Sequence, residues 1–429
     1  MADAKRSATK KPMRMVLRLL GPGLVTGAAD DDPSGIATYS QAGAQFGYGL
    51  LWTVFLTTPF MIAIQLVSAR IGRVTGKGLA ANVMELAPRW LVLALVFLLV
   101  LANTFNIAAD IAAMGESLSL VVGGLSHEHA LIFAATSTLL QVFVPYRRYA
   151  PVLKFLTLTL FAYVATALTV DIPWSKALLS TVWPTPTINA NYFLMVVAVL
   201  GTTISPYLFF WQASQEVEEM HQGKLDRPLR ELNKGGDPEL KRIRIDTTVG
   251  MFFSNAIAFF IILTTAAVLN AHGVTNINSA TQAAEALRPL AGDFTFLLFA
   301  LGIIGTGMLA IPVLAGSAAY GVAEAFGWRA TLEAKAPDAV GFYTIIAAAT
   351  VIGFGLGFTG IDAIKMLVWS AVLNGIVAVP IMAMMMLIVA NAGLMGRFRA
   401  KSWLLALGWL GTGLMAVAVI ALFGSFVAG

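Results

Sequence analysis

Asp30-Asp31-Asp32-Pro33-Ser34-Gly35 interrupts a long apolar segment, residues 19–40, with consecutive carboxylates followed by a proline. A charged group inside a membrane-spanning helix costs about 2.5 to 3.5 kcal/mol on insertion scales, so such a cluster predicts a functional site. Pro33 cannot donate a backbone hydrogen bond and Gly35 is a poor helix former, so we expect the helix to break here. Broken backbone at this depth is tolerated only where protein buries it or where it lines a cavity.

The composition of the whole chain supports a membrane span at this stretch. Of its 429 residues, 58% are hydrophobic and only 12% are charged, and the mean hydropathy is +0.78. Soluble domains need a polar coat and are about a quarter charged. The sequence has no cysteine, which excludes disulfides and thiolate metal sites. The net charge of +5 is scattered over short loops without forming a basic face, so we expect no nucleic-acid partner.

Apolar runs bounded by charges, proline or glycine predict eleven membrane spans. Each is long enough, or nearly so, for the ~20 residues that cross a hydrocarbon core. The runs are residues 19–40, 46–68, 90–122, 129–146, 150–170, 192–215, 247–271, 293–326, 338–358, 363–391 and 402–427. The sequence therefore predicts an all-α integral membrane protein with a single transmembrane domain, residues 1–429.

The positive charges predict the orientation, because Lys and Arg next to spans stay on the cytoplasmic side. With residues 1–18 as a cytoplasmic tail, all of the 28 Lys and Arg except Lys176, Arg288 and Lys365 fall on the cytoplasmic side. A wrong number of spans would scramble this alternation from the error onward. We therefore expect a multi-pass protein of the cell membrane, with the N-terminus in the cytoplasm and the C-terminus outside.

The sixth span contains a second predicted break, at Gly201-Thr202-Thr203-Ile204-Ser205-Pro206-Tyr207. Interrupted helices at corresponding places of two halves are typical of inverted-repeat transporters. The first repeat is expected at about residues 19–170, the second at about 192–391, and an extra helix at about 402–427. In this geometry half-helix ends meet near the bilayer midplane. The predicted cation site there combines Asp32, carbonyls around Thr202 and the hydroxyl of Ser205.

Other polar residues of the predicted spans are candidates for surrounding this site. Asn103, Asn106 and Asp110 share one face of the third span. That face either borders a central cavity or makes interhelical hydrogen bonds. The full set of candidate second-layer or vestibule residues is Asp30, Asp31, Ser34, Gly35, Asn103, Asp110, Tyr207 and Asn374.

The cytoplasmic end of the sixth span and the polar stretch after it allow more than one interpretation. The helix end carries three acidic residues, Glu216, Glu218 and Glu219. They either line an acidic exit vestibule or are simply exposed to solvent at the end of the helix. The stretch from His221 to Asp246 is expected to be a cytoplasmic linker. Its last part, residues 240–245, either lies along the membrane surface or is a solvated connector.

The broken first span and its surroundings resemble the Nramp family of divalent-metal transporters. The similar motifs are Gly21-Pro22-Gly23, Asp32-Pro33, Ala42-Gly43-Ala44-Gln45-Phe46-Gly47-Tyr48, Ala109-Asp110-Ile111-Ala112 and the break in the sixth span. The resemblance runs through most of the chain. It implies a LeuT-type fold of the APC superfamily, with two inverted five-helix repeats, an eleventh helix, and helices one and six broken.

The chain also departs from the family's pattern. The first-helix motif Asp-Pro-Gly-Asn retains only Asp32 and Pro33, and Ser205-Pro206-Tyr207 stands where the family has Met-Pro-His. Gln212 lies near the place of a second family histidine, and Ala113 replaces an acidic residue. The missing thioether is a soft ligand that favours transition metals. With these changes, the chain resembles the Nramp-related magnesium transporters, which also lack the methionine.

The resulting expectation is a secondary transporter of Mg²⁺ or Mn²⁺ that works by alternating access around Asp32, with weak or no proton coupling. We expect no cofactor other than the transported ion, no enzymatic activity and a monomer in the lipid bilayer. The alternative is a transporter of a small organic cation or amino acid, for which Ser34 and Gly35 leave room. A membrane sensor or scaffold is disfavoured because the sequence has no large cytoplasmic domain.

Overall fold

The computed structural model describes residues 21–145, 148, 153, 155–184, 189–222, 226–232, 235–359 and 362–428. The predicted cytoplasmic tail, residues 1–18, and part of the predicted fifth span lie outside them. The long helices are α4 (Leu51–Thr75), α6 (Arg89–Val122), α7 (Ser126–Phe143), α13 (Asp237–Val268), α16 (Thr295–Phe326), α17 (Val340–Leu356), α18 (Ala363–Ala390) and α20 (Ser402–Ala428).

Two further pairs of helices are nearly continuous. They are α2 (Pro22–Asp30) with α3 (Pro33–Phe46), and α11 (Ala190–Thr203) with α12 (Pro206–Gln222). The short helices are α5 (Leu79–Met84), α9 (Phe161–Thr169), α10 (Trp174–Val182), α14 (Ala280–Ala284), α15 (Arg288–Ala291) and α19 (Ala392–Met395). Single 3₁₀ turns are η1 (Gly47–Leu50), η2 (Leu158–Leu160), η3 (Leu229–Glu231), η4 (Asn270–His272), η5 (Glu285–Leu287), η6 (Gly292–Phe294), η7 (Ala336–Asp338), η8 (Gly357–Thr359) and η9 (Gly396–Phe398).

Within the described residues, seven helical runs are long and apolar enough to cross a membrane. They are Pro33–Thr75, Arg89–Val122, Ala190–His221, Asp237–His272, Ala280–Phe326, Ala363–Ala390 and Ser402–Val427, with shorter apolar helices at Phe155–Thr169 and Val340–Leu356. The protein is therefore a multi-pass, all-helical membrane protein. The number of eleven spans stays a prediction.

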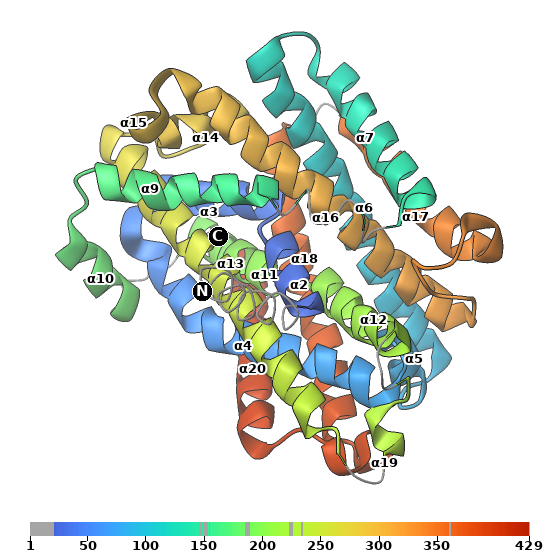
Figure 1. Ribbon diagram of the computed structural model, residues 1–429. Coiled ribbons are helices and arrows are strands. Elements are labelled where there is room, and N and C mark those ends of the chain that lie inside the picture. Colours follow the sequence, from blue (N-terminus) through green and yellow to red (C-terminus); the bar gives the residue numbers. More distant parts are fainter. Residues whose placement is uncertain are drawn as a thin grey trace, which may run out of the picture.

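The short helices gather at opposite ends of the bundle. In Figure 1, α14 and α15 lie towards the upper left and α10 lies at the left edge, whereas α5 and α19 lie towards the lower right. The first group belongs to loops predicted outside the cell, and the second to loops predicted inside it. Which of the two ends faces the cytoplasm stays a prediction.

The first broken helix packs against α13 and the second against α18. A Cβ atom added at Gly27 would lie 2.4 Å from the carbonyl of Gly250 on α13. One added at Gly201 would lie 2.1 Å from the carbonyl oxygen of Ala371 on α18. Only glycine permits such close backbone approach, which is how membrane helices gain contact area without a hydrophobic driving force. Both breaks are held in place next to glycine contacts of this kind.

The stretch from residue 240 to residue 245 is neither a separate helix along the membrane nor an irregular connector, although Lys241, Arg244 and Ile245 are exposed. Helix α13 begins at Asp237 and runs without interruption to Val268, so these residues form its first turns. Pro238 occupies a first-turn position, where a missing N–H costs nothing, and Asp237 and Glu239 favour the positive end of the helix dipole.

Candidate functional site

The carboxylate of Asp32 lies at the first break, between α2 and α3. Asp32 is the N-cap residue of α3, and its Oδ1 atom accepts hydrogen bonds from the Gly35 backbone N–H and the Ser34 hydroxyl, both at 2.7 Å. Its Oδ2 atom accepts from the Asn106 amide and the Tyr207 hydroxyl, both at 3.2 Å. Asp32 is only 1% exposed. The break is thus stabilised by the side chain that the sequence predicts to bind a cation.

Three other helices converge on Asp32. Asn106 comes from α6, and its Oδ1 atom accepts a hydrogen bond of 2.7 Å from the Ser370 hydroxyl of α18. Tyr207 comes from α12, and its hydroxyl lies 3.1 Å from the carbonyl of Ala29 as well as near Asp32. A phenol has one proton, so Tyr207 can donate to only one of these two acceptors at a time.

Asp30 and Asp31 share a partner on α13. The Ser254 hydroxyl lies 2.6 Å from Asp30 Oδ2 and 3.1 Å from Asp31 Oδ1. This hydroxyl also has a single proton, so one carboxylate is left without a donor from it. Asp30 is completely buried, and its Oδ1 atom has no hydrogen-bond partner among the described residues.

Asp110 lies on α6 one turn after Asn106, towards the Ser34 amide and the Asp32 carboxylate. It is completely buried, and neither of its oxygens reaches hydrogen-bond geometry with a described residue. Asn374, on α18 one turn after Ser370, is 1% exposed and is likewise unpartnered within the described part of the chain. Unpartnered buried polar atoms are costly, so these side chains favour a site that takes a ligand or water.

Thr202 and Ser205, the other predicted cation ligands, differ in position. The Thr202 hydroxyl abuts the first break, since a Cβ atom added at Gly35 would lie 3.2 Å from it. The Ser205 hydroxyl faces back into its own break, 2.8 Å from the carbonyl of Gly201 and 3.0 Å from that of Thr202. Ser205 therefore has to turn before it can bind a cation, and both ligand roles stay predictions.

Asn103, another predicted site residue, forms its hydrogen bonds with α16 and none with Asp32. Its amide nitrogen donates to the Leu314 carbonyl and to the Ser317 hydroxyl of α16, both at 2.8 Å. The interhelical hydrogen bond that the sequence left as one of two possibilities is present here.

The polar side chains in contact with Asp32 and Asp30 offer hard oxygen atoms as ligands. Within the described residues, no group of three or more His, Cys, Asp or Glu side chains is arranged to hold a metal ion. A cation here would be held by one or two carboxylates together with hydroxyls, carbonyls and water. Mg²⁺ is commonly bound in this way, because it gives up its hydration water reluctantly.

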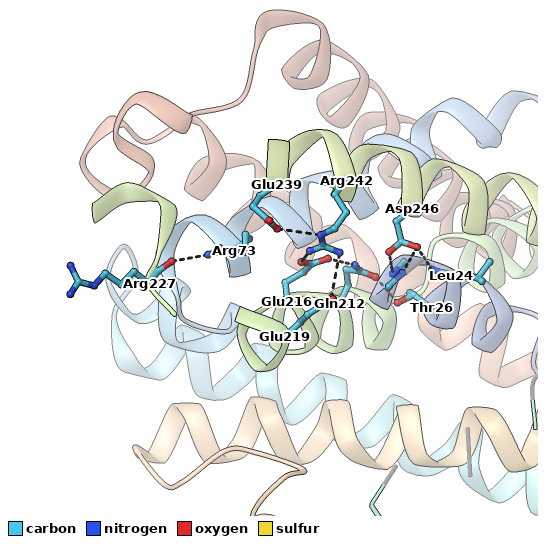
Figure 2. Close-up of polar contacts among 12 residues, drawn as sticks. Leu24, Thr26, Arg73, Gln212, Glu216, Glu219, Arg227, Glu239, Arg242 and Asp246 are labelled. Carbon is cyan, nitrogen blue, oxygen red and sulfur yellow. Dashed lines mark hydrogen bonds and ion pairs between the residues drawn. The ribbon is translucent and has the colours of Figure 1, made fainter. Parts of the chain in front are cut away.

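A polar seal lies at the end of α2 that is predicted to face the cytoplasm (Figure 2). The carboxylate of Asp246, on α13, accepts hydrogen bonds from the backbone N–H groups of Gly21 (2.8 Å), Gly23 (2.7 Å) and Leu24 (3.2 Å). Helix α2 has no side-chain cap of its own. Asp246 thus caps a helix that is more than 220 residues away in the sequence.

Arg242, one turn before Asp246, completes the seal. Its guanidinium pairs with Glu216 (2.9 Å), Glu219 (3.4 Å) and Glu239 (3.2 Å), and the Glu216 side chain is fully buried. The Gln212 amide donates to Glu216 and accepts a hydrogen bond from the Thr26 hydroxyl of α2 (Figure 2).

The structure separates the three glutamates that the sequence treated together. Glu216 is fully buried in its ion pair with Arg242, whereas the Glu219 side chain is 40% exposed, as expected for a solvated helix end. Glu218 accepts hydrogen bonds from the Tyr320 hydroxyl and the Leu332 backbone and lines a cavity of about 970 Å³. The sequence signal that was available is the pairing of acidic residues at one helix end with basic residues at the start of the next.

Comparison with known proteins agrees with this architecture. The family model for Nramp, natural resistance-associated macrophage protein-like, matches residues 23–425. The divalent metal cation transporter MntH of Klebsiella pneumoniae strain 342 is 26% identical over 433 residues, which cover 99% of this chain and 97% of that protein. MntH of Yersinia pestis strain Pestoides F is 26% identical over 314 residues, covering 70% and 71%.

Solved structures show the same fold. A manganese transporter of Eremococcus coleocola superimposes with a TM-score of 0.74 at 15% identity, covering 96% of this chain and 87% of that one. The nucleobase-cation-symport-1 transporter Mhp1 in a closed conformation gives a TM-score of 0.56 at 13% identity, covering 94% and 90%. The fold is the LeuT-type fold of these transporters. Because the family model spans nearly the whole chain, this protein belongs to the Nramp family of membrane transporters.

Proposed function

We propose that the protein is a secondary transporter of a hard divalent metal cation, Mg²⁺ or Mn²⁺, with Asp32 at the centre of its binding site. The observation that carries this proposal is charge. Asp30, Asp31, Asp32 and Asp110 are all buried around one helix break, and none pairs with a Lys or Arg among the described residues. Burying so many carboxylates without a counter-charge is costly, so the cluster favours a bound cation.

The hydrogen bonds of Asp32 indicate how a cation would enter its site. Each carboxylate oxygen of Asp32 accepts two hydrogen bonds from protein donors. An incoming ion therefore has to displace one of these donors. Tyr207 can leave at the lowest cost, because the Ala29 carbonyl offers its hydroxyl another acceptor at 3.1 Å. An ion that keeps much of its hydration shell needs only one such displacement, which favours Mg²⁺.

The relatives support a divalent cargo. The Klebsiella protein is a divalent metal cation transporter, and the Eremococcus protein is a manganese transporter. The preference for Mg²⁺ or Mn²⁺ over softer ions follows from the oxygen-only ligands at the break and from Ser205 and Tyr207 in the second break.

Transport would proceed by alternating access, in which the seal of Arg242 and Asp246 opens after the outer side has closed. We propose weak or no proton coupling, because Gln212 is a neutral amide that bridges Thr26 and Glu216. The membrane potential can drive uptake instead. It supplies about 2.3 kcal/mol per charge per 100 mV, or about twice that for a divalent ion.

The proposed architecture rests on the two helix breaks, and the proposed orientation rests on the distribution of Lys and Arg. Two inverted repeats cover about residues 19–170 and 192–391, and residues 402–427 form an extra helix. The corresponding positions of the α2/α3 and α11/α12 interruptions support this division. The protein would act as a monomer in the cell membrane, with its N-terminus in the cytoplasm and its C-terminus outside.

The organic-cation alternative loses the feature that favoured it. A Cβ atom added at Gly35 would meet Thr202 Oγ1 at 3.2 Å, and the Asp30 carbonyl and the Tyr39 ring at 3.4 Å. The missing side chain is thus replaced by neighbours and does not leave an open space for an ammonium or guanidinium group.

Flux into proteoliposomes tests the proposal. The purified protein should carry Mg²⁺ and Mn²⁺ down an imposed potential, and Asp32→Ala should abolish the flux of both ions. Asp293→Ala, which removes an exposed carboxylate from the 3₁₀ turn η6, is the matched control and should transport like the parent. If Asp32→Ala transports as well as the control, the site is wrong. An internal pH dye in the same vesicles tests the coupling, since strict proton symport would acidify the lumen in proportion to metal uptake.

A further inference from the structure

A cavity of about 290 Å³ lies between the ends of α4, α13 and α20 that are predicted to face the cytoplasm. Four basic side chains line it: Arg70 from α4, Lys241 and Arg244 from α13, and Lys401 from the turn before α20. Trp403 and Leu404 of α20 also line it. We call this cavity the basic groove.

The charges of the basic groove are poorly compensated. Asp237 is the single acidic residue in its lining. Arg70 uses its Nε atom to donate to the Phe398 carbonyl at 2.7 Å, which holds the guanidinium in position. Its terminal nitrogens form no hydrogen bond with another described residue. Within the described part of the chain, Lys241, Arg244 and Lys401 form no ion pair. The groove therefore carries an excess of positive charge.

The side chains around the groove are those expected where a protein meets the membrane surface. Trp403, at its rim, is 47% exposed, and tryptophan is enriched where lipid headgroups meet the hydrocarbon core. The same two helices continue with exposed apolar side chains, including Leu410 at 60% on α20 and Phe252 at 56% on α13. Leu404 is only 2% exposed and forms part of the apolar lining. A basic groove followed by exposed apolar side chains is complementary to a ligand with an anionic head and an apolar tail.

We propose that the basic groove binds the headgroup of an anionic phospholipid. Basic pockets between membrane helices on the cytoplasmic side are suited to phosphate-bearing headgroups, and each nearby Lys or Arg strengthens the attraction. Arg70 supplies a planar guanidinium that can contact two phosphate oxygens, and the two lysines supply mobile point charges around it.

The first turns of α13 connect the groove to the seal described above. Lys241 and Arg244 line the groove, whereas Arg242 and Asp246 hold the carboxylates of α12 and the N-terminus of α2. These pairs are three and four residues apart, so each pair shares one face of the helix. A headgroup bound in the groove therefore holds α13 where its other face closes the seal, and we expect it to raise the melting temperature of the protein.

Lipid binding can be measured without any transport assay. The intact protein is placed in nanodiscs of phosphatidylcholine with or without phosphatidylglycerol, and retained lipid is counted by native mass spectrometry while melting is followed in parallel. The groove variant is Lys241→Gln/Arg244→Gln/Lys401→Gln. Its matched control, Arg89→Gln/Arg329→Gln/Lys335→Gln, removes the same charge from other segments predicted to be cytoplasmic.

The parent and the control should retain phosphatidylglycerol and melt at a higher temperature in its presence. Each basic side chain contributes about fivefold to binding, so the groove variant should bind about a hundredfold more weakly. Equal retention by the groove variant and the parent would overturn the proposal, and so would equal loss in both triple variants. If the groove variant does not fold, the single changes Lys241→Gln and Lys401→Gln replace it, each expected to lose about fivefold. Inorganic phosphate alone should not reproduce the thermal shift, and a shift of the same size would identify a free-anion site instead.

Discussion

The two broken helices occupy corresponding places in the chain, but they are stabilised in different ways. At the first break, Asp32 caps α3 and also accepts hydrogen bonds from Asn106 and Tyr207, which belong to other helices. At the second break, the Ser205 hydroxyl donates to carbonyls of its own span, Gly201 and Thr202. The first break is held by a negative charge and by distant donors, whereas the second is satisfied locally by a neutral group.

The N-termini of the two broken helices show the same contrast. Helix α11 is capped by its own Asn189, whose side chain accepts from the Tyr192 N–H at 2.8 Å. Helix α2 receives its cap from Asp246 of α13. A helix whose ends are held by other elements can change partners as those elements move. This contrast supports the proposal that the first broken helix binds the cation and controls access to it.

Proline alone does not cause a break in this protein. Pro59, Pro312 and Pro380 lie inside the continuous helices α4, α16 and α18. A membrane helix tolerates proline when its neighbours satisfy the freed carbonyls. What distinguishes Pro33 is the residue before it, because Asp32 offers the following turn an acceptor and starts a new helix.

The largest effect that sharpens the comparison is expected from Asp110→Asn. Removing this second carboxylate beside Asp32 should lower metal flux by roughly ten- to a hundredfold, the loss typical of groups that support a metal site. The same change should raise the melting temperature, because it removes a buried charge without a hydrogen-bond partner among the described residues. Flux assays and thermal melts measure the two effects. Normal flux, or a lower melting temperature, would contradict the role given to the first break.

The two helix caps should differ in their effect on access to the site. Asp246→Ala removes the acceptor for three backbone N–H groups of α2 and should loosen the seal. Because the chain has no cysteine, Thr26→Cys provides a single thiol on α2, and its labelling rate should rise when Asp246→Ala is added.

The matched control is Asn189→Ala in the same Thr26→Cys background. It should cost about 1 kcal/mol of stability, as lost caps usually do, and leave the labelling rate unchanged. Equal labelling in both variants would remove the distinction between a cap from another helix and a local one.

Ser205→Ala tests the second break directly. Loss of its hydroxyl should destabilise the protein by about 1 kcal/mol, the usual net worth of one hydrogen bond. If Ser205 turns to bind the ion as predicted, the apparent affinity for Mg²⁺ and Mn²⁺ should also fall, which the concentration dependence of flux measures. An unchanged affinity would show that Ser205 only stabilises the second break and is not a cation ligand.

The smallest effect is expected from Met114→Leu on α6. Met114 Sδ and Pro33 Cγ lie 2.6 and 3.2 Å from the position of a Cβ atom added at Gly307, so this sulfur is close to the first break. If oxygen atoms alone bind the ion, the change should preserve the ratio of Mg²⁺ to Mn²⁺ flux and cost less than about 1.5 kcal/mol of stability. A shift of that ratio towards Mg²⁺ would show that a thioether takes part.

The positions of the helices and of the two breaks could be predicted from local features of the sequence. The described parts of the apolar runs lie mostly on helices, and the stretches around Pro33 and Pro206 mark the positions where helices end and begin again. Hydropathy, proline and the cost of a buried charge act on neighbouring residues, so they are readable without a fold. The same reasoning identified Asp32 and Asp110 as candidates, and the family motifs agree with it.

The partners of these residues depended on the tertiary structure. Nothing near Asp246 in the sequence indicates that it caps α2, and Arg242 joins glutamates of α12 and its own helix in one network. The direction of the Ser205 hydroxyl and the packing of Asn103 against α16 were equally open. Helix crossing decides which polar atoms meet, and that geometry depends on close contacts such as Gly27 with Gly250, between residues far apart in the chain. The sequence by itself determined which predicted spans contain charged residues. The packing of the helices decided which hydrogen bonds and ion pairs those residues form.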